Sequence, residues 1–149
     1  MSLYKIKLSK ERCILCHACE IHCQVQNRMP PDVRLNSITA QGPTPDDEGR
    51  PRMKPKYQPC LHCKKPECVA ACPTGALYIR KSDGLVLLKD ELCDGCQACV
   101  SACPFGVPRM HPATGKMVKC DLCVERIDRG LDPACVAGCT GHALTFVRP

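Results

Sequence analysis

The cysteines of this chain fall into four groups of four, and their spacing is the feature most able to support chemistry. The first and third groups share the spacing C-x₂-C-x₂-C-x₃-C, whereas the second gap widens to four residues in the second group and to eleven in the fourth. The 16 cysteines leave none outside a group. In chain order the groups are Cys13, Cys16, Cys19 and Cys23 (run 1); Cys60, Cys63, Cys68 and Cys72 (run 2); Cys93, Cys96, Cys99 and Cys103 (run 3); and Cys120, Cys123, Cys135 and Cys139 (run 4).

The spacing of runs 1 and 3 is typical of the ligand run of bacterial ferredoxins. In such a run the first three thiolates bind three irons of one [4Fe–4S] cubane, and the fourth thiolate binds the neighbouring cluster. A proline follows Cys72 and Cys103, as in that pattern, whereas Gln24 follows Cys23 and Thr140 follows Cys139. Sixteen cysteines in such runs predict four [4Fe–4S] clusters.

Because each run lends its fourth cysteine to another run, the runs must be paired. Runs 2 and 3 are joined by a segment of ferredoxin length with a hairpin signal at Asp83-Gly84, so we expect them to form one module and runs 1 and 4 to form the other. The alternative joins run 1 with run 2 and run 3 with run 4. The expected ligand sets are Cys13, Cys16, Cys19 with Cys139 (site A); Cys120, Cys123, Cys135 with Cys23 (site B); Cys60, Cys63, Cys68 with Cys103 (site C); and Cys93, Cys96, Cys99 with Cys72 (site D).

Two other cysteine chemistries compete with this interpretation. Paired C-x₂-C units also bind zinc, so a zinc-stabilised interaction or nucleic-acid-binding module is the alternative from a different class. Zinc sites use two separated pairs, which does not explain a third and fourth cysteine at such short spacing. The segment from Cys13 to His17 matches the haem motif C-x-x-C-H, but it lies in register inside run 1, so we interpret the match as coincidence.

Composition restricts the class and the compartment further. Aromatic residues make up only 3% of the chain, so bound metal is expected to contribute to folding. The N-terminus has no apolar signal sequence, and no segment is long and apolar enough to span a bilayer. We therefore expect a cytoplasmic protein with reduced thiols. The formal net charge of +6 falls to about −2 if each of the four sites carries about −2, which argues against nucleic acid as a partner.

Short elements must position these runs. Residues 77–88 predict a β-hairpin around Asp83-Gly84, and residues 4–8 and 144–147 predict strands near the two ends. A turn at Thr114-Gly115 is expected to precede a short strand at 116–118. The clearest helix is predicted at 121–129, where Gly130 ends it.

The expected fold class is α+β, built from two interleaved bacterial-ferredoxin-like modules that each bind two [4Fe–4S] clusters. The inner module takes residues 60–109, and the outer module takes 1–29 together with 110–149. Residues 30–59 hold seven of the 14 prolines and show no clear periodicity. We expect this segment to be a Pro-rich insertion that serves as a docking loop, with a plain linker as the alternative.

Most of the sequence resembles the iron–sulfur subunits of the dimethyl-sulfoxide-reductase and formate-hydrogenlyase type. The segments that carry the resemblance are 59–76, 93–106, 119–126 and 133–136, and the first three cysteines of run 1 fit the first run of that family. The resemblance implies four clusters in a line and a molybdenum- or tungsten-pterin catalytic subunit as partner. In its compactness the chain is similar to the small subunit of tungsten aldehyde oxidoreductases, which implies an aldehyde oxidoreductase as the leading candidate.

An electron-transfer role follows from the ligand sets. If every iron has a thiolate, no coordination position is open for a substrate, so the chain is predicted to pass single electrons and not to be an enzyme by itself. A flavoprotein or a hydrogenase subunit is the candidate for the second partner. An independent soluble polyferredoxin is the alternative, and self-association is left open. Basic residues next to ligands either raise nearby cluster potentials or are only solvated or in contact with a partner, and both alternatives stay open; these are Arg12, Lys64, Lys65, Arg109 and Lys119.

Overall fold

Short helices and two-stranded sheets build the protein in the computed structural model, which describes residues 2–149. Within these residues the helices are α1 (Ala18–Asn27), α2 (Glu67–Ala70), α3 (Ala98–Ala102), α4 (Val124–Ile127) and α5 (Ala134–Ala137), with a 3₁₀ turn, η1 (Asp90–Leu92). The strands are β1 (Lys5–Leu8), β2 (Ser37–Pro45), β3 (Pro51–Gln58), β4 (Leu77–Ile79), β5 (Val86–Leu88), β6 (Arg109–Met110), β7 (Met117–Val118) and β8 (Leu144–Val147).

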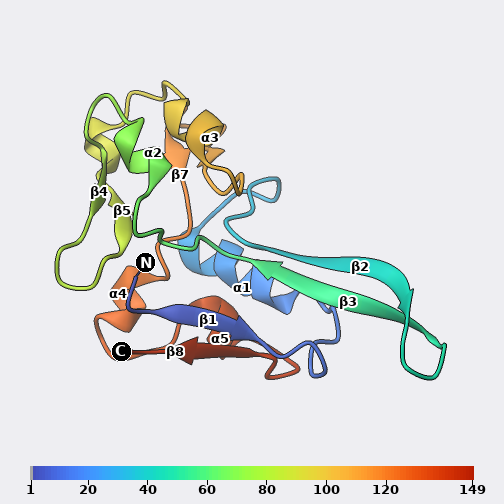
Figure 1. Ribbon diagram of the computed structural model, residues 1–149. Coiled ribbons are helices and arrows are strands. Elements are labelled where there is room, and N and C mark those ends of the chain that lie inside the picture. Colours follow the sequence, from blue (N-terminus) through green and yellow to red (C-terminus); the bar gives the residue numbers. More distant parts are fainter. Residues whose placement is uncertain (1) are drawn as a thin grey trace.

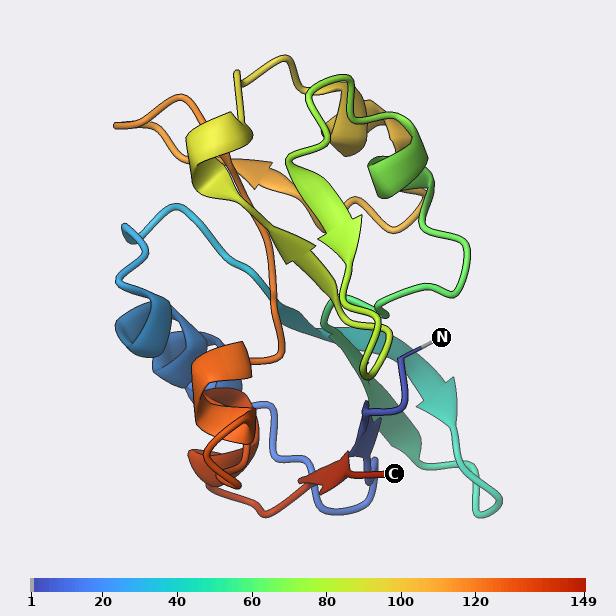
Figure 2. The ribbon, with the colours of Figure 1, turned by 90° about the vertical axis from the view of Figure 1, so that its left-hand side faces the viewer.

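The two ends of the chain lie together in one lobe of the molecule. β1 pairs antiparallel with β8, so that Ile6 lies opposite Phe146, and α1 contacts α5 (Figure 1). The other lobe contains the contact between α2 and α3 and the antiparallel pairs β4–β5 and β6–β7 (Figure 2). Segments that are far apart in the sequence thus share the first lobe.

The hydrophobic core is small, and cysteine side chains are part of it. One buried cluster of residues draws on both lobes and contains Cys23, Val33, Leu35, Leu85, Leu87, Cys120, Leu122 and Ile127. A second lies in the lobe of the chain ends and contains Cys19, Ile38, Cys135 and Leu144. A third lies in the other lobe and contains Leu77, Val86, Cys99 and Met117. The thiols therefore occupy positions that large apolar side chains fill in most proteins.

The predicted hairpin and the strands near the chain ends are confirmed. β4 and β5 pair around Asp83 and Gly84, where the Asp83 carboxylate accepts a hydrogen bond from the Leu85 amide at 3.2 Å. Arg80 holds this turn, because its guanidinium forms ion pairs with both Asp83 and Asp128. Asp128 follows α4, so the pair ties the hairpin to the other lobe.

Two expectations about secondary structure were wrong. The predicted helix at 121–129 is reduced to α4, because Cys123 adopts a left-handed conformation (φ 52°) and α4 begins only after it. The longest helix among the described residues is instead α1, with 10 residues. Residues 30–59 are not a loop, since they contain strands β2 and β3, which pair along most of their length.

This β2–β3 hairpin projects from the side of the molecule and ends far from either lobe (Figure 1). Its base is fixed by buried polar contacts. The Ile38 amide donates to the Glu20 carboxylate of α1 at 2.8 Å, and the Asn36 amide group donates to the Tyr57 hydroxyl at 2.8 Å. No helix within residues 2–149 has the length and apolar character needed to cross a membrane.

Candidate metal centres

Each cysteine run begins with a tight loop that turns at the residue before the second cysteine. This residue has a positive φ in all four runs: Leu15 at 54°, His62 at 45°, Gly95 at 76° and Leu122 at 59°. Such a conformation costs a non-glycine residue about 1–3 kcal/mol, so packing or a bound group must impose it. Glycine is required at position 95, because a Cβ there would lie 2.3 Å from the carbonyl oxygen of Gly115.

Three of the four expected ligand sets each line one cavity. Cys13, Cys16 and Cys19 of run 1 share a cavity with Cys139 of run 4, as site A requires. The cavity of site C joins Cys60, Cys63 and Cys68 with Cys103, and that of site D joins Cys93, Cys96 and Cys99 with Cys72. In each case the fourth cysteine comes from a different run from the first three.

The cysteines of site B are the most deeply buried of the ligands. Burial, with smaller contributions from the neighbouring Cys135 and Cys123, raises the pKa of Cys23 to about 12. Burial also raises the pKa of Cys120 well above its ordinary value, with additional contributions from Cys60, Cys23 and Cys135. These mutual effects on the pKa values indicate that Cys23 of run 1 lies near the first three cysteines of run 4.

The helices bring cysteines of different runs together. Cys19 and Cys23 lie four residues apart on α1, which places them on one face and about 6 Å apart along the helix axis. Cys135 lies on α5, and Cys139 follows the end of that helix. Since α1 contacts α5, the two helices together bring ligands to sites A and B. The contact between α2 and α3 does the same for sites C and D.

The donor sets fit cubane clusters better than single metal ions. Within residues 2–149, no three side chains of Cys, His, Asp or Glu lie close enough to hold one ion. Thiolates on a tetrahedral zinc lie about 4 Å apart, since each Zn–S bond is about 2.3 Å. Wider sets of four thiols are what a larger inorganic core requires. Burial raises the pKa of these thiols and so favours their neutral form. Iron bound at these sites must therefore stabilise the thiolate form against the effect of burial.

Ligands of different sites affect one another's pKa values between A and B, between B and C, and between C and D. Cys19 of site A has a pKa of about 12, which is raised first by burial and also by Cys135 of site B. Cys120 of site B is affected in the same way by Cys60 of site C. Burial raises the pKa of Cys99 in site D, and Cys68 of site C adds to the effect. Each site therefore has a ligand near a ligand of the next.

Each site also receives a hydrogen bond to at least one ligand sulfur. Backbone amides serve sites A and D, where Ala143 donates to Cys139 at 3.2 Å and Met117 donates to Cys93 at 3.4 Å. In site B the Asn27 side chain lies 3.5 Å from the Cys23 sulfur. In site C the donor is the Lys119 ammonium, 3.8 Å from the Cys60 sulfur. Such bonds are one determinant of cluster potential.

The five basic residues that adjoin ligands in the sequence differ in their exposure to solvent. Arg12, Lys64, Lys65 and Arg109 are exposed, whereas Lys119 is buried, with 7% of its surface accessible. Sequence reasoning did not single out His62, whose side chain is 1% exposed. Its Nδ1 accepts a hydrogen bond from the Val86 amide at 2.9 Å. Burial lowers the pKa of His62 to about 2, and Lys119 adds to this effect, so the ring is neutral.

Comparison with known proteins places the sequence in a family. Residues 52–148 and residues 12–76 each match the family described as "4Fe-4S dicluster domain". The chain therefore belongs to this 4Fe-4S dicluster family, and it holds four [4Fe–4S] clusters.

The relatives are named as subunits of oxidoreductases. The chain is 38% identical to the B subunit of polysulfide reductase of Wolinella succinogenes, over 90% of the chain and 70% of the relative. It is 36% identical to the thiosulfate reductase electron transfer subunit PhsB of Salmonella typhi, over 97% and 76%. It is 34% identical to the B subunit of anaerobic dimethyl sulfoxide reductase of Escherichia coli, over 96% and 72%. The resemblance to the dimethyl-sulfoxide-reductase type is therefore confirmed, and the protein is an electron-transfer subunit and not a catalytic one.

Proposed function

We propose that this protein relays single electrons through four [4Fe–4S] clusters held in two interleaved pairs, A with B and C with D. The outer module, residues 1–29 and 110–149, holds the first pair, and the inner module, residues 60–109, holds the second. The observation that carries this proposal is that each lined cavity combines three cysteines of one run with the fourth cysteine of another. Pairing run 1 with run 2 would place other cysteines together.

The clusters supply reversible one-electron chemistry when they are bound, and the protein holds them apart from reactants. Because four thiolates per site provide one ligand for each iron of a cubane, no iron has an open coordination position for a substrate. In this proposal the four sites follow one another in space from one lobe to the other, so that electrons entering at one end leave at the other. Buried apolar side chains pack against five of the thiols and keep water from them, which limits side reactions at the irons they would bind; these are Cys19, Cys23, Cys99, Cys120 and Cys135.

We propose a molybdenum- or tungsten-pterin oxidoreductase as the catalytic partner, with an aldehyde oxidoreductase as the leading candidate. The resemblance to iron–sulfur subunits of such enzymes supports the pterin partner. A flavoprotein or a hydrogenase subunit would exchange electrons at the other end, and the assembly would work in the cytoplasm. The relatives favour a second candidate, a reductase for polysulfide, thiosulfate or dimethyl sulfoxide.

Purification of the native complex without oxygen tests this proposal. We expect about 16 irons and 16 acid-labile sulfides per chain, the content of four cubanes, and a larger pterin-containing subunit in equal amount. An aldehyde should reduce the clusters of the leading candidate, whereas polysulfide, thiosulfate or dimethyl sulfoxide should oxidise reduced clusters of the second. A colourless protein that contains zinc would contradict electron transfer, and an iron-loaded protein that elutes alone would indicate an independent polyferredoxin.

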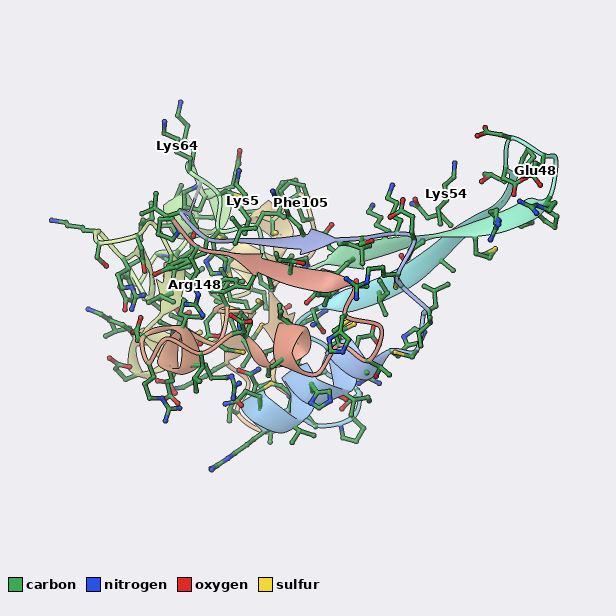
Figure 3. The ribbon with its side chains drawn as sticks, turned by 90° about the horizontal axis from the view of Figure 1, so that it is seen from below. Lys5, Glu48, Lys54, Lys64, Phe105 and Arg148 are labelled. Atoms are coloured by element: carbon green, nitrogen blue, oxygen red, sulfur yellow. The ribbon has the colours of Figure 1, made fainter. Side chains whose placement is uncertain are left out.

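The β2–β3 hairpin is suited to dock this partner. Lys54 and Lys56 lie two residues apart on β3 and face the same side of the hairpin, opposite Gln41 and Thr39 of β2. Lys54 lies along the same side of the molecule as Lys5 and Lys64 (Figure 3). At the tip, the Asp46 carboxylate accepts hydrogen bonds from the Arg50 backbone and from Arg50 and Arg52 side chains, which keeps the turn ordered. The arrangement favours a partner surface with acidic side chains.

Removing two charges from this face is expected to slow association without loss of iron. The variant Lys54→Gln/Lys56→Gln should bind the pterin subunit about three- to tenfold more slowly at low salt, since charge complementarity mainly affects association rates. The difference should shrink as salt screens the charges. Stopped-flow association at two salt concentrations measures both effects. The matched control Lys81→Gln/Arg129→Gln removes two exposed charges elsewhere; an equal slowing in this control would contradict a docking role for the hairpin.

A further inference from the structure

Lys119 is a buried cation placed between two metal centres. Its ammonium lies 3.8 Å from the Cys60 sulfur of site C and donates a hydrogen bond to the carbonyl oxygen of Cys120, a ligand of site B, at 2.8 Å. The side chain also forms part of the wall of the site C cavity, together with Cys60, Cys63, Cys68 and Cys103. Its charge reaches a second ligand of this site, because it lowers the pKa of Cys68 against the larger effect of burial.

This ammonium has no acidic side chain to balance it. Within residues 2–149, no carboxylate lies within ion-pair distance of Lys119. Asp121, the nearest acidic residue in sequence, uses its carboxylate to accept a hydrogen bond from the Cys123 amide at 2.8 Å. A buried charge without a partner is costly, so the compensating charge must come from elsewhere. Thiolate-bound clusters carry net negative charge and supply it.

Lys119 lies where an electron would pass between the two modules, from site B to site C or in the reverse direction. Sites A and B are linked by α1 and α5, and sites C and D by α2 and α3, whereas no helix among the described residues carries ligands of both B and C. Lys119 contacts both Cys60 of site C and Cys120 of site B, so ligands of the two modules meet at this side chain. At the other three sites the groups that hydrogen-bond to ligand sulfurs are neutral amides and the Thr74 hydroxyl, so site C alone has a cationic donor within residues 2–149.

We propose that Lys119 raises the reduction potential of the site C cluster and thereby sets the driving force for electron transfer between the two modules. The inference rests on the proposed function, because it requires clusters at B and C as neighbours. Reduction adds one negative charge to a cluster, and a cation within hydrogen-bonding distance of its sulfur stabilises that charge. Only an electron moves in this step, so no bond is formed or broken.

Potentiometric titration followed by electron paramagnetic resonance tests the role of Lys119 in the purified complex. In Lys119→Gln the side chain keeps a donor but loses its charge. We expect one cluster to become harder to reduce, with at least a tenfold lower ratio of reduced to oxidised cluster at a fixed potential, which is about 59 mV for one electron. Lys119→Arg should stay close to the parent, because it keeps the charge. The signal that shifts should be the one that is lost in Cys63→Ser, a ligand variant of site C.

The matched control is Lys64→Gln, which removes a lysine next to Cys63 in sequence but exposed in the structure. It should leave all four potentials unchanged. Unchanged potentials in Lys119→Gln, or an equal shift in Lys64→Gln, would overturn the inference. If neutral variants lost the site C cluster while Lys119→Arg kept it, Lys119 would serve assembly and the inference would also fail. A parent protein without four clusters would instead refute the proposed function.

Discussion

Replacing Cys139 with serine is expected to damage the cluster bound by the N-terminal run, although Cys139 lies at the other end of the sequence. Cys139 lines the cavity of site A with Cys13, Cys16 and Cys19. Serine is a poorer ligand for iron than cysteine thiolate, so we expect iron to fall from about 16 to about 12 per chain if the cubane is lost. Iron analysis and electron paramagnetic resonance measure the change.

Double variants show which cysteines share a cluster. Cys16→Ser and Cys139→Ser should remove the same signal, and the double variant should lose about four irons, not about eight, since both changes affect one cubane. The control pair Cys16→Ser/Cys23→Ser changes two cysteines of run 1 that serve different sites and should lose about eight. Loss of a signal shared with Cys123 instead of Cys16 would show that run 4 keeps its own fourth cysteine, which the interleaved arrangement forbids.

Removal of iron is expected to unfold the protein. Each buried hydrophobic cluster contains at least one cysteine ligand, and the helices that carry ligands are at most 10 residues long. Helices of this length are unstable in water without packing, and a two-stranded hairpin alone is marginal at best. Binding of structural metal contributes about 10–16 kcal/mol to folding in small zinc domains, which indicates the scale of what is lost.

Far-UV circular dichroism and amide hydrogen exchange before and after anaerobic chelation measure this effect. We expect protection to be lost throughout α1, α2, α3 and α5 and to return when iron and sulfide are restored. Reassembly should be favoured as the pH rises toward the ordinary pKa of a thiol, because the thiols of the unfolded chain must release protons to bind iron. An iron-free protein with unchanged spectrum and exchange would show that the apolar core is sufficient.

The cluster chemistry could be predicted from the sequence because ligand spacing is a local property. In runs 1 and 3 the first three cysteines lie within seven residues, so a single loop brings them to one metal core independently of the rest of the protein. The hairpin at Asp83 and Gly84 was equally local, since the turn residues determine its geometry. For the same reason the number and type of clusters followed from the cysteine runs alone.

The alternation along β3 was present in the sequence but was hidden by its prolines. Arg52, Lys54 and Lys56 alternate with Met53, Pro55 and Tyr57, a period of two that indicates a strand. Proline usually argues against a strand, but β2 and β3 form an isolated two-stranded sheet with free outer edges, where a missing amide is tolerated. The helix at 121–129 was predicted too long because the cysteine loop uses the residues before Val124 for ligand geometry.

The sequence by itself determined the sixteen thiols, their grouping into runs and the class of cofactor they suit. Only the tertiary structure showed which cysteines of different runs line a common cavity, and which of five basic residues is buried. Lys119 and Lys64 each adjoin a cysteine in sequence, yet only Lys119 of these two is buried, with its ammonium near the Cys60 sulfur of site C and the backbone carbonyl of Cys120 of site B. The physical reason is the separation along the chain: coordination within a loop depends on neighbours in the sequence, whereas burial and charge depend on distant segments that folding brings into contact, as for Lys119 and Cys60, which are 59 residues apart.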